Sequence, residues 1–368
     1  MLWISCSVVA LLAGGVLAAL FAQRTFRQAR AASALRIESA RGILEERFVK
    51  IGGIEQWIGI RGEDHDNPVL LVIHGGPGSC YSIFTPHLRA WEKHFSLVQW
   101  DQRGSGRTFA RWGPRGSGEI SMEQLKRDGI EVAEYLCSRL RKDRIFLLAS
   151  SFGSTFGLQI ARCRPDLFLA YIGADQNVGM VRRRDENHRE VLERLREVGL
   201  GRGVRTLERI GADPKHWTYD DFTAVARWTM KSDPRGFRRT MKLLKDAIWY
   251  APGWRLRDIR AFVGGMHFSL VQLLPEASRH DAWQEGVRFE IPFFIIQGEN
   301  DVLTAPSLAR AYFNDVVAPI KRMILISDAG HFAAFLQPDQ FLDELLTHVR
   351  PLAQNSSMQL ARCPDERS

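Results

Sequence analysis

Short apolar runs alternate with helical patterns through most of the chain from about residue 45 onward. Runs of this length fit strands that are buried on both faces of a sheet. We expect such strands at residues 69–73, 96–100, 144–148, 167–173, 293–296 and 321–326. Because the first four runs alternate with helical patterns such as residues 122–140, the sequence predicts an α/β protein with a mostly parallel sheet.

Two other stretches depart from this alternation. Residues 47–51 and 54–60 flank a Gly52-Gly53 pair, which predicts a β-hairpin ahead of the parallel strands. Between about residues 175 and 290 the strand pattern stops and an arginine-rich, helical pattern takes its place. Its five tryptophans are better explained as packing residues of that stretch than as substrate contacts: Trp217, Trp228, Trp249, Trp254 and Trp283.

The amino-terminal segment is the most apolar part of the chain. Residues 2–22 contain no charge, and arginines such as Arg24, Arg27 and Arg30 follow them. We therefore expect a single-pass membrane anchor over residues 1–22, a linker or juxtamembrane helix over 23–44 and a catalytic domain on the cytoplasmic side. A processed secretory or transit segment and a buried core helix are the alternatives.

Composition narrows the range of partners. The chain has 368 residues, a formal net charge of +8 and a pI near 9.4. Its arginines are scattered and form no basic stripe with interleaved aromatics, so we expect no nucleic-acid partner. The cysteines are odd in number and lack metal-ligand spacing, which favours reduced thiols and no metal site: Cys6, Cys80, Cys137, Cys163 and Cys363. Residues 353–368 are predicted to be a polar tail.

Ser151 is the candidate nucleophile. It lies between a buried strand and a helical pattern, where the turn must be very tight and strained. Such a turn needs small residues two positions away on both sides, and Ser151 has Ala149 and Gly153 there. Ser150 would instead have Phe152 at one of these positions, so we exclude it. The pattern departs mildly from Gly-x-Ser-x-Gly because Ala149 replaces the first glycine.

Glycine-rich turns follow two of the other predicted strands. Residues 74–78 read HGGPG and residues 101–108 read DQRGSGRT. Glycines directly after a strand allow backbone N–H groups to approach a reacting carbonyl oxygen. His74 precedes these glycines, and we interpret it as a residue that stabilises the turn.

Together, HGGPG, DQRG and the Ser151 turn resemble the α/β-hydrolase fold family, in particular its prolyl aminopeptidase (proline iminopeptidase) branch. The resemblance spans roughly residues 45–350. It implies an α/β-hydrolase fold, with a mostly parallel sheet flanked by helices and a helical cap inserted at residues 175–290. The core is then divided into residues 45–174 and 291–352.

The resemblance also implies a Ser-Asp-His triad. A serine hydroxyl needs an imidazole as base, and the imidazole needs a carboxylate to orient it. In this family the acid and the histidine follow the serine on loops after later strands. Asp301 and His331 match those positions, whereas we interpret the neighbouring Glu299 and Asp328 as loop residues.

We therefore expect an acyl hydrolase that needs no cofactor. The oxyanion would be bound by the backbone N–H groups of Gly76 and Phe152. The family resemblance implies small peptides as substrates, whose amino terminus requires an acidic cap residue. The candidates are Asp175, Asp185, Glu186 and Glu190. An esterase or amidase with small or lipid-like substrates is the main alternative, and a non-catalytic binding protein is a further one.

Overall fold

An eight-stranded sheet forms the centre of the molecule. The computed structural model describes residues 2–179 and 181–354, with side chains from residue 14 onward. The strands are β1 (Ile43–Ile51), β2 (Ile54–Gly62), β3 (Val69–Ile73), β4 (Ser96–Asp101), β5 (Ile145–Ser150), β6 (Phe168–Ala174), β7 (Phe293–Gly298) and β8 (Lys321–Ile326). Their spatial order is β1-β2-β4-β3-β5-β6-β7-β8.

Strand direction divides the sheet into two parts. β1 and β2 form an antiparallel hairpin, and β2 pairs antiparallel with β4. From β4 to β8 all neighbours are parallel. Every residue of β3, β4, β5 and β7 is buried, as expected for strands covered on both faces. The predicted α/β class, the hairpin and the parallel strands are confirmed.

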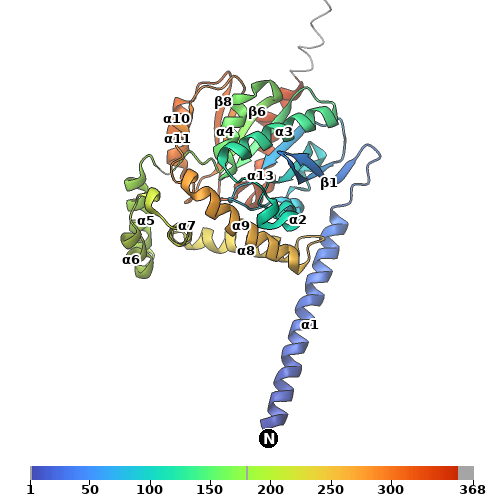
Figure 1. The fold of residues 1–368 in the computed structure, drawn as a ribbon, viewed down its shortest axis with the longest axis vertical. Coiled ribbons are helices and arrows are strands. Elements are labelled where there is room, and N and C mark those ends of the chain that lie inside the picture. The colour runs from blue at the N-terminus through green and yellow to red at the C-terminus, as the bar shows by residue number, and fades with distance from the viewer. Residues whose placement is uncertain (1, 180, 355–368) are drawn as a thin grey trace, which may run out of the picture.

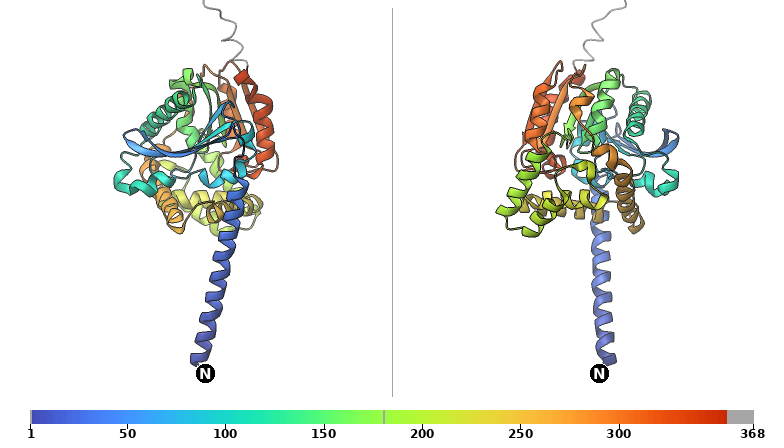
Figure 2. Two further views of the ribbon diagram at one scale, coloured as in Figure 1. Left: turned by 90° about the vertical axis from the view of Figure 1, so that its right-hand side faces the viewer. Right: turned by 60° about the vertical axis from the view of Figure 1, so that its left-hand side comes forward.

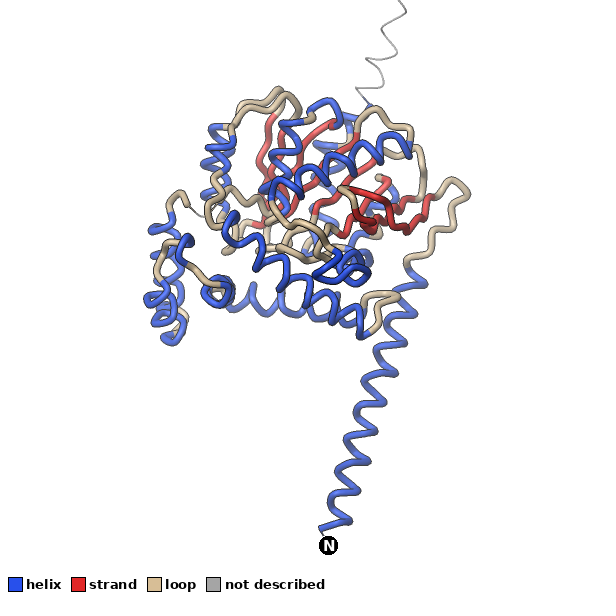
Figure 3. Tube along the Cα trace, viewed as in Figure 1, coloured by secondary structure: helices blue, strands red, loops and turns tan. Residues whose placement is uncertain are grey.

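Helices cover both faces of this sheet (Figures 1 and 3). The α-helices are α1 (Leu2–Ala34), α2 (Gly106–Gly116), α3 (Met122–Leu140), α4 (Gly153–Cys163), α5 (Arg184–Glu197), α6 (Gly201–Ile210), α7 (Tyr219–Lys231), α8 (Pro234–Tyr250), α9 (Leu256–Ala277), α10 (Ala282–Glu285), α11 (Pro306–Asp315), α12 (Ala333–Leu336) and α13 (Pro338–Glu344). The shorter helical turns are η1 (Ser82–Leu88), η2 (Trp91–Lys93), η3 (Pro165–Leu167), η4 (Pro214–His216) and η5 (Leu345–Val349).

Two apolar clusters, one on each face, hold these layers together. On one face α3, α4 and α11 contribute buried side chains such as Val132, Phe156 and Tyr312. On the other face η1, α12 and α13 contribute side chains such as Phe84 and Phe341. Burial of apolar surface on both faces fixes the sheet as the rigid support of the site.

Only helices lie between β6 and β7 in the part of the chain that the structure describes. α8 and α9 lie beneath the sheet, and α5, α6 and α7 lie to one side of it (Figure 1). α9 packs along α2, while α7 contacts α5, α6, α8 and α9. The loss of strand pattern after residue 175 therefore corresponds to a helical segment.

The expected single-pass membrane anchor at residues 1–22, on which the cytoplasmic placement of the catalytic domain rested, is wrong. Among the described residues, no helix combines the length and the apolar character that crossing a membrane requires. The helix continues past the apolar run, because α1 extends to Ala34, within the residues predicted to be a linker or juxtamembrane helix. Figure 2 shows α1 projecting from the body. Its carboxyl-terminal part is attached there: the buried Arg24 side chain donates to the carbonyls of Trp249 and Trp254.

Some predictions lie partly or wholly outside the described residues. The polar tail predicted at residues 353–368 lies outside them from residue 355 onward. The thiols of Cys6 and Cys363 are likewise not described. Cys80, Cys137 and Cys163 are free cysteines.

Candidate active site

Ser151 occupies a sharp turn between β5 and α4. Its φ of +52° is in the left-handed region, which non-glycine residues rarely adopt and which indicates local strain. The turn needs a glycine two residues later, because a Cβ on Gly153 would lie 2.4 Å from the carbonyl oxygen of His74. This steric limit explains why a glycine lies two positions after Ser151.

The two neighbouring serines point to different partners. The Ser150 hydroxyl is buried and lies 2.8 Å from the phenol oxygen of Tyr81. The Ser151 Oγ lies 2.9 Å from Nε2 of His331. Of the two hydroxyls, that of Ser151 is the one that contacts an imidazole.

The structure brings Ser151, His331 and Asp301 into one hydrogen-bonded chain. His331 lies on the loop after β8, and its Nδ1 is 2.8 Å from Oδ2 of Asp301 on the loop after β7. Parallel strands end at the same edge of a sheet, which brings residues from distant parts of the chain together. Thr304 donates its hydroxyl to Asp301 Oδ2 at 2.6 Å and its N–H to Oδ1 at 3.0 Å, which orients the carboxylate.

Asp301 and His331 shift each other's pKa. Burial raises the pKa of Asp301, but the His331 charge and hydrogen bonds from His331 and Thr304 outweigh burial and lower it below its ordinary value. Burial lowers the pKa of His331, but Asp301 and Asp175 outweigh this effect and raise it to about 9. The imidazolium is therefore strongly stabilised in the folded protein.

Two backbone N–H groups adjoin the surroundings of Ser151, because Phe152 follows it directly and Gly76 follows Gly75, on which an added Cβ would lie 2.8 Å from the Ser151 Cβ. Gly76 has a φ of +124° on the turn after β3, and Phe152 directly follows Ser151. In the described part of the chain, neither N–H donates a hydrogen bond to the protein. Unpaired N–H donors close to a nucleophile suit a developing oxyanion.

His74 holds two glycine-rich turns together. It is 1% exposed, its Nδ1 bonds to the Gly75 carbonyl and its Nε2 accepts from the N–H of Gln102 at 3.3 Å. Burial lowers its pKa to about 4. The neutral imidazole thus supports the backbone between the HGGPG and DQRG segments, and its ring does not contact Ser151.

The other carboxylates singled out in the sequence do not contact the His331 imidazole. Glu299 accepts the N–H of Asp328 at 2.8 Å, and Asp328 pairs with two arginines on α8.

The four candidates for binding an amino terminus lie in two different parts of the structure. Asp185, Glu186 and Glu190 lie on α5, where each pairs with an arginine of the same region. Asp175 is buried beside His331 instead.

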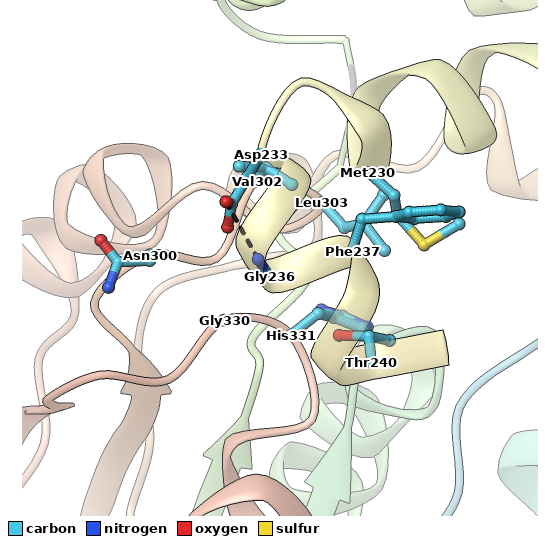
Figure 4. A pocket seen from close by; sticks show the side chains of 10 residues that line it. All are labelled: Met230, Asp233, Gly236, Phe237, Thr240, Asn300, Val302, Leu303, Gly330 and His331. Atoms are coloured by element: carbon cyan, nitrogen blue, oxygen red, sulfur yellow. Dashed lines mark hydrogen bonds between the residues drawn. The ribbon is translucent and has the colours of Figure 1, made fainter. Parts of the chain in front are cut away.

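A small cavity adjoins His331. Its volume is about 20 Å³, and Figure 4 shows its lining side chains on α7, α8 and the strand-end loops. Four apolar side chains, four polar or charged ones and two glycines line it: Met230, Phe237, Val302 and Leu303; Asp233, Thr240, Asn300 and His331; Gly236 and Gly330. A wider cleft of about 650 Å³, which Glu190 also lines, shares five residues with this cavity: Asp233, Gly236, Asn300, Val302 and Gly330. Asp233 is thus the acidic residue among those lining the cavity.

Asp233 is the residue that the sequence did not reveal, whereas Asp175 was named from the sequence only as a candidate for binding an amino terminus. Asp175 directly follows a buried parallel strand, a position where site residues commonly lie, and this signal was sufficient to place it at the site. Asp233 caps α8 by accepting the N–H of Gly236 at 3.0 Å. A helix cap carries no sequence signal for a binding site.

The buried polar cluster also has the spacing of a metal site. Donor atoms of Asp175, Asp301 and His331 all lie within 4.8 Å of one another. Both ring nitrogens of His331 are, however, already paired, one with Asp301 and one with Ser151. This pairing suits His331 to exchange a proton with Ser151 while Asp301 orients the ring, and it leaves neither ring nitrogen free to bind a metal.

Comparisons with known proteins identify the fold family. Residues 68–338 match the family model described as alpha/beta hydrolase fold. The probable aminopeptidase YbaC of Bacillus subtilis is 27% identical over 323 residues, which are 85% of this chain and 99% of that protein. A proline iminopeptidase of Saccharolobus solfataricus is 20% identical over 82% of this chain and 90% of its own length. The crystal structure of a membrane phospholipase A has a TM-score of 0.59 at 17% identity, covering 96% of this chain and 99% of that one.

Proposed function

Because the chain belongs to the α/β-hydrolase fold family and is a hydrolytic enzyme, we propose that it is a serine hydrolase that removes amino-terminal residues, prolyl residues among them, from small peptides. One observation carries the catalytic part of this proposal. The Ser151 hydroxyl, the His331 imidazole and the Asp301 carboxylate form hydrogen bonds of 2.9 and 2.8 Å in sequence. A nucleophile, a base and an orienting acid in this order are the requirements of acyl transfer.

In the first step Ser151 Oγ attacks the substrate carbonyl carbon. His331 Nε2 takes the hydroxyl proton, and Asp301 stabilises the resulting imidazolium through Nδ1–H. The carbonyl oxygen becomes an oxyanion that accepts hydrogen bonds from the N–H groups of Gly76 and Phe152.

The second step releases the products. His331 gives its proton to the leaving nitrogen or oxygen as the tetrahedral intermediate collapses to an acyl-enzyme. A water molecule then loses a proton to the same imidazole and attacks the acyl carbon, and Ser151 is restored. Every proton in this cycle passes through Nε2 of His331, so no further base is needed.

The substrate assignment has two supports. The first is the similarity to the aminopeptidase and the proline iminopeptidase named above. The second is Asp233, which lines the cavity beside His331 and forms no salt bridge within the described residues. An ammonium group in a partly buried cavity requires a nearby carboxylate, because an unpaired buried charge is costly. We assign the helices between β6 and β7 as a cap that supplies this carboxylate through Asp233.

An esterase is the second candidate, and the apolar side chains in the same cavity favour it. Side chains such as Met230, Phe237 and Leu303 suit an uncharged acyl group. A neutral ester needs no carboxylate partner, so the two functions differ in their dependence on a free amino group.

Labelling with a fluorophosphonate probe tests the serine chemistry. We expect the wild type and Ser150→Ala to be labelled and to hydrolyse a short-chain aryl ester, while Ser151→Ala does neither. Loss of a triad residue typically lowers turnover by about 10⁴–10⁶. Absence of labelling in the wild type would instead favour a non-catalytic binding protein.

Three substrates then separate the peptidase from the esterase. We expect a prolyl arylamide to be cleaved and its N-acetylated form to be a poor substrate, since acetylation removes the ammonium charge. Cleavage of the aryl ester with no turnover of the prolyl arylamide would leave esterase as the function.

A further inference from the structure

Asp175 lies at the catalytic edge of the sheet, directly after β6. It is 1% exposed and has a φ of +50°. Aspartate tolerates the left-handed region better than most residues, but such a conformation persists only where the surroundings enforce it. A strained, buried aspartate beside a candidate active site requires a physical explanation.

One carboxylate oxygen of Asp175 holds the loop that carries His331. Its Oδ2 accepts the N–H of Phe332 at 3.0 Å, and Phe332 itself has a φ of +71°. Two left-handed residues from segments far apart in the chain are thus joined by one hydrogen bond. This bond constrains the backbone directly after His331.

The second carboxylate oxygen has no such partner. Within the described residues Asp175 Oδ1 is buried and makes no hydrogen bond. A buried acceptor left without a hydrogen bond is costly, and native proteins contain few of them. The nearest compensation is electrostatic, because donor atoms of Asp175, Asp301 and His331 lie within 4.8 Å of one another.

Three titratable groups from three different segments interact with Asp175. They are His331 after β8, Asp301 after β7 and the Tyr81 phenol before η1. Burial and the Asp301 charge raise the pKa of Asp175 to about 7, while the His331 charge and the Phe332 N–H oppose the rise. Asp175 in turn contributes to the raised pKa of His331. The two groups are therefore coupled electrostatically.

We propose that Asp175 is a second acidic partner of His331, a positioning residue that holds the histidine loop through Phe332 and stabilises the imidazolium together with Asp301. The proposal rests on the serine-hydrolase function proposed above. Asp301 occupies Nδ1 and Ser151 occupies Nε2, so Asp175 acts on the ring through its charge and on the loop through its hydrogen bond.

The substitution Asp175→Asn tests the charge separately from the backbone contact. Asparagine has nearly the same size, keeps an oxygen that accepts from Phe332, and tolerates the left-handed region. We expect the pKa of His331, measured by NMR on histidine-labelled protein and assigned with His331→Gln, to fall by about one pH unit. The acid limb of kcat/KM for an aryl ester should move to lower pH by the same amount, with its plateau about ten-fold lower.

The loop after β8, which carries His331, also contains a matched control residue. Asp328 also has a positive φ, of +52°, but its charge pairs with Arg235 and Arg239 at 3.1 and 3.0 Å. We expect Asp328→Asn to leave the NMR midpoint of His331 unchanged. A purely structural role of Asp175 would also leave that midpoint unchanged in Asp175→Asn, and this result would overturn the proposal.

The wild type supplies a second measurement that needs no variant. As Asp175 ionises near pH 7, the ring resonances of His331 should show a second, smaller step below the main titration. A single step at all pH values would contradict the proposal even if Asp175→Asn failed to fold. The proposed function fails separately, if Ser151→Ala hydrolyses the ester as fast as the wild type, and the NMR titration still decides the influence of Asp175 on His331.

Discussion

At the scale of single residues, steric constraint and burial define the candidate site. Ser151, Asp175 and Phe332 are non-glycine residues with positive φ, and all three lie at the carboxyl edge of the sheet. Strained backbone of this kind persists where the surrounding structure determines it, and it concentrates at functional sites. The strain at Ser151 presents its hydroxyl to His331, whereas Ser150, with extended backbone in β5, directs its hydroxyl to Tyr81.

The first prediction concerns the acidic residue in the cavity. Asp233→Asn removes a negative charge but keeps an N-terminal cap for α8, since asparagine caps helices as well as aspartate does. We expect KM for a prolyl arylamide to rise by about ten-fold or more, because the ammonium group loses its partner. Hydrolysis of the neutral aryl ester by the same variant is the internal control and should change little. An equal loss on both substrates would show that Asp233 does not recognise the amino group.

The second prediction concerns the stability of the turns next to the site. Buried His74 has a pKa of about 4, below the ordinary value near 6.5. Between these two values the unfolded chain binds a proton that the folded protein does not, so folding becomes less favourable as pH falls. The stabilisation lost through His74 between pH 7 and pH 4 is about 3 kcal/mol.

Urea unfolding of the wild type and His74→Gln at several pH values measures this effect. Other groups titrate in both proteins and cancel in the comparison. We expect the advantage in unfolding free energy of the wild type over His74→Gln to shrink steadily below pH 6.5. An advantage that stays constant down to pH 4 would show that His74 is not the group responsible.

At the scale of elements, α8 connects the amino-terminal helix with the site. Its amino-terminal half carries Phe237 and Thr240 at the cavity, and its carboxyl end is held by α1. Arg24 and Gln28 donate to the carbonyls of Trp249, Ala251 and Trp254 at 2.7–3.0 Å. The last carbonyls of a helix lack partners within the helix, and a cation there is favourable.

The third prediction follows from this contact. Arg24→Ala leaves buried carbonyl oxygens without their charged donor, so we expect the free energy of unfolding to fall by about 2 kcal/mol. Arg30→Ala is the matched control, because Arg30 lies on the same helix and is exposed. Equal urea midpoints for the two variants would mean that α1 contributes nothing to the stability of α8.

At the scale of the whole molecule, the cavity exists only because two distant parts of the chain meet. Met230 and Phe237 come from α7 and α8, while Val302, Leu303 and His331 come from the loops after β7 and β8. Its volume of about 20 Å³ has room for about one water molecule. Given the proposed function, we expect the helices between β6 and β7 to limit the size of the acyl group that reaches Ser151.

The fourth prediction tests this limit. Phe237→Ala removes the aromatic ring from the wall of the cavity, so we expect kcat/KM for a butyryl or longer ester to rise relative to the acetyl ester. Each methylene that the enlarged cavity accommodates is worth about 1–3 kcal/mol, or roughly ten-fold or more in this ratio. Phe26→Ala on the exposed surface of α1 is the control. An unchanged ratio in Phe237→Ala would show that another wall determines acyl size.

The sequence by itself determined the elements and the local chemistry. Apolar runs in the sequence predict the buried strands, because a strand covered on both faces tolerates few polar side chains. The tight turn at Ser151 was predictable for a similar reason, since a side chain at Gly153 would collide with the backbone of His74. These are local constraints, and each acts within a few residues of the chain.

Only the tertiary structure decided which distant groups touch. Asp175 and Phe332 are 157 residues apart, and nothing near either of them in the sequence indicates their hydrogen bond. The membrane anchor failed for a related reason. That prediction used only the apolar character of the residues before Arg24. It used neither the continuation of α1 beyond them nor the backbone carbonyls that bind this arginine. Contacts through space depend on the packing of the whole chain, which no local pattern encodes.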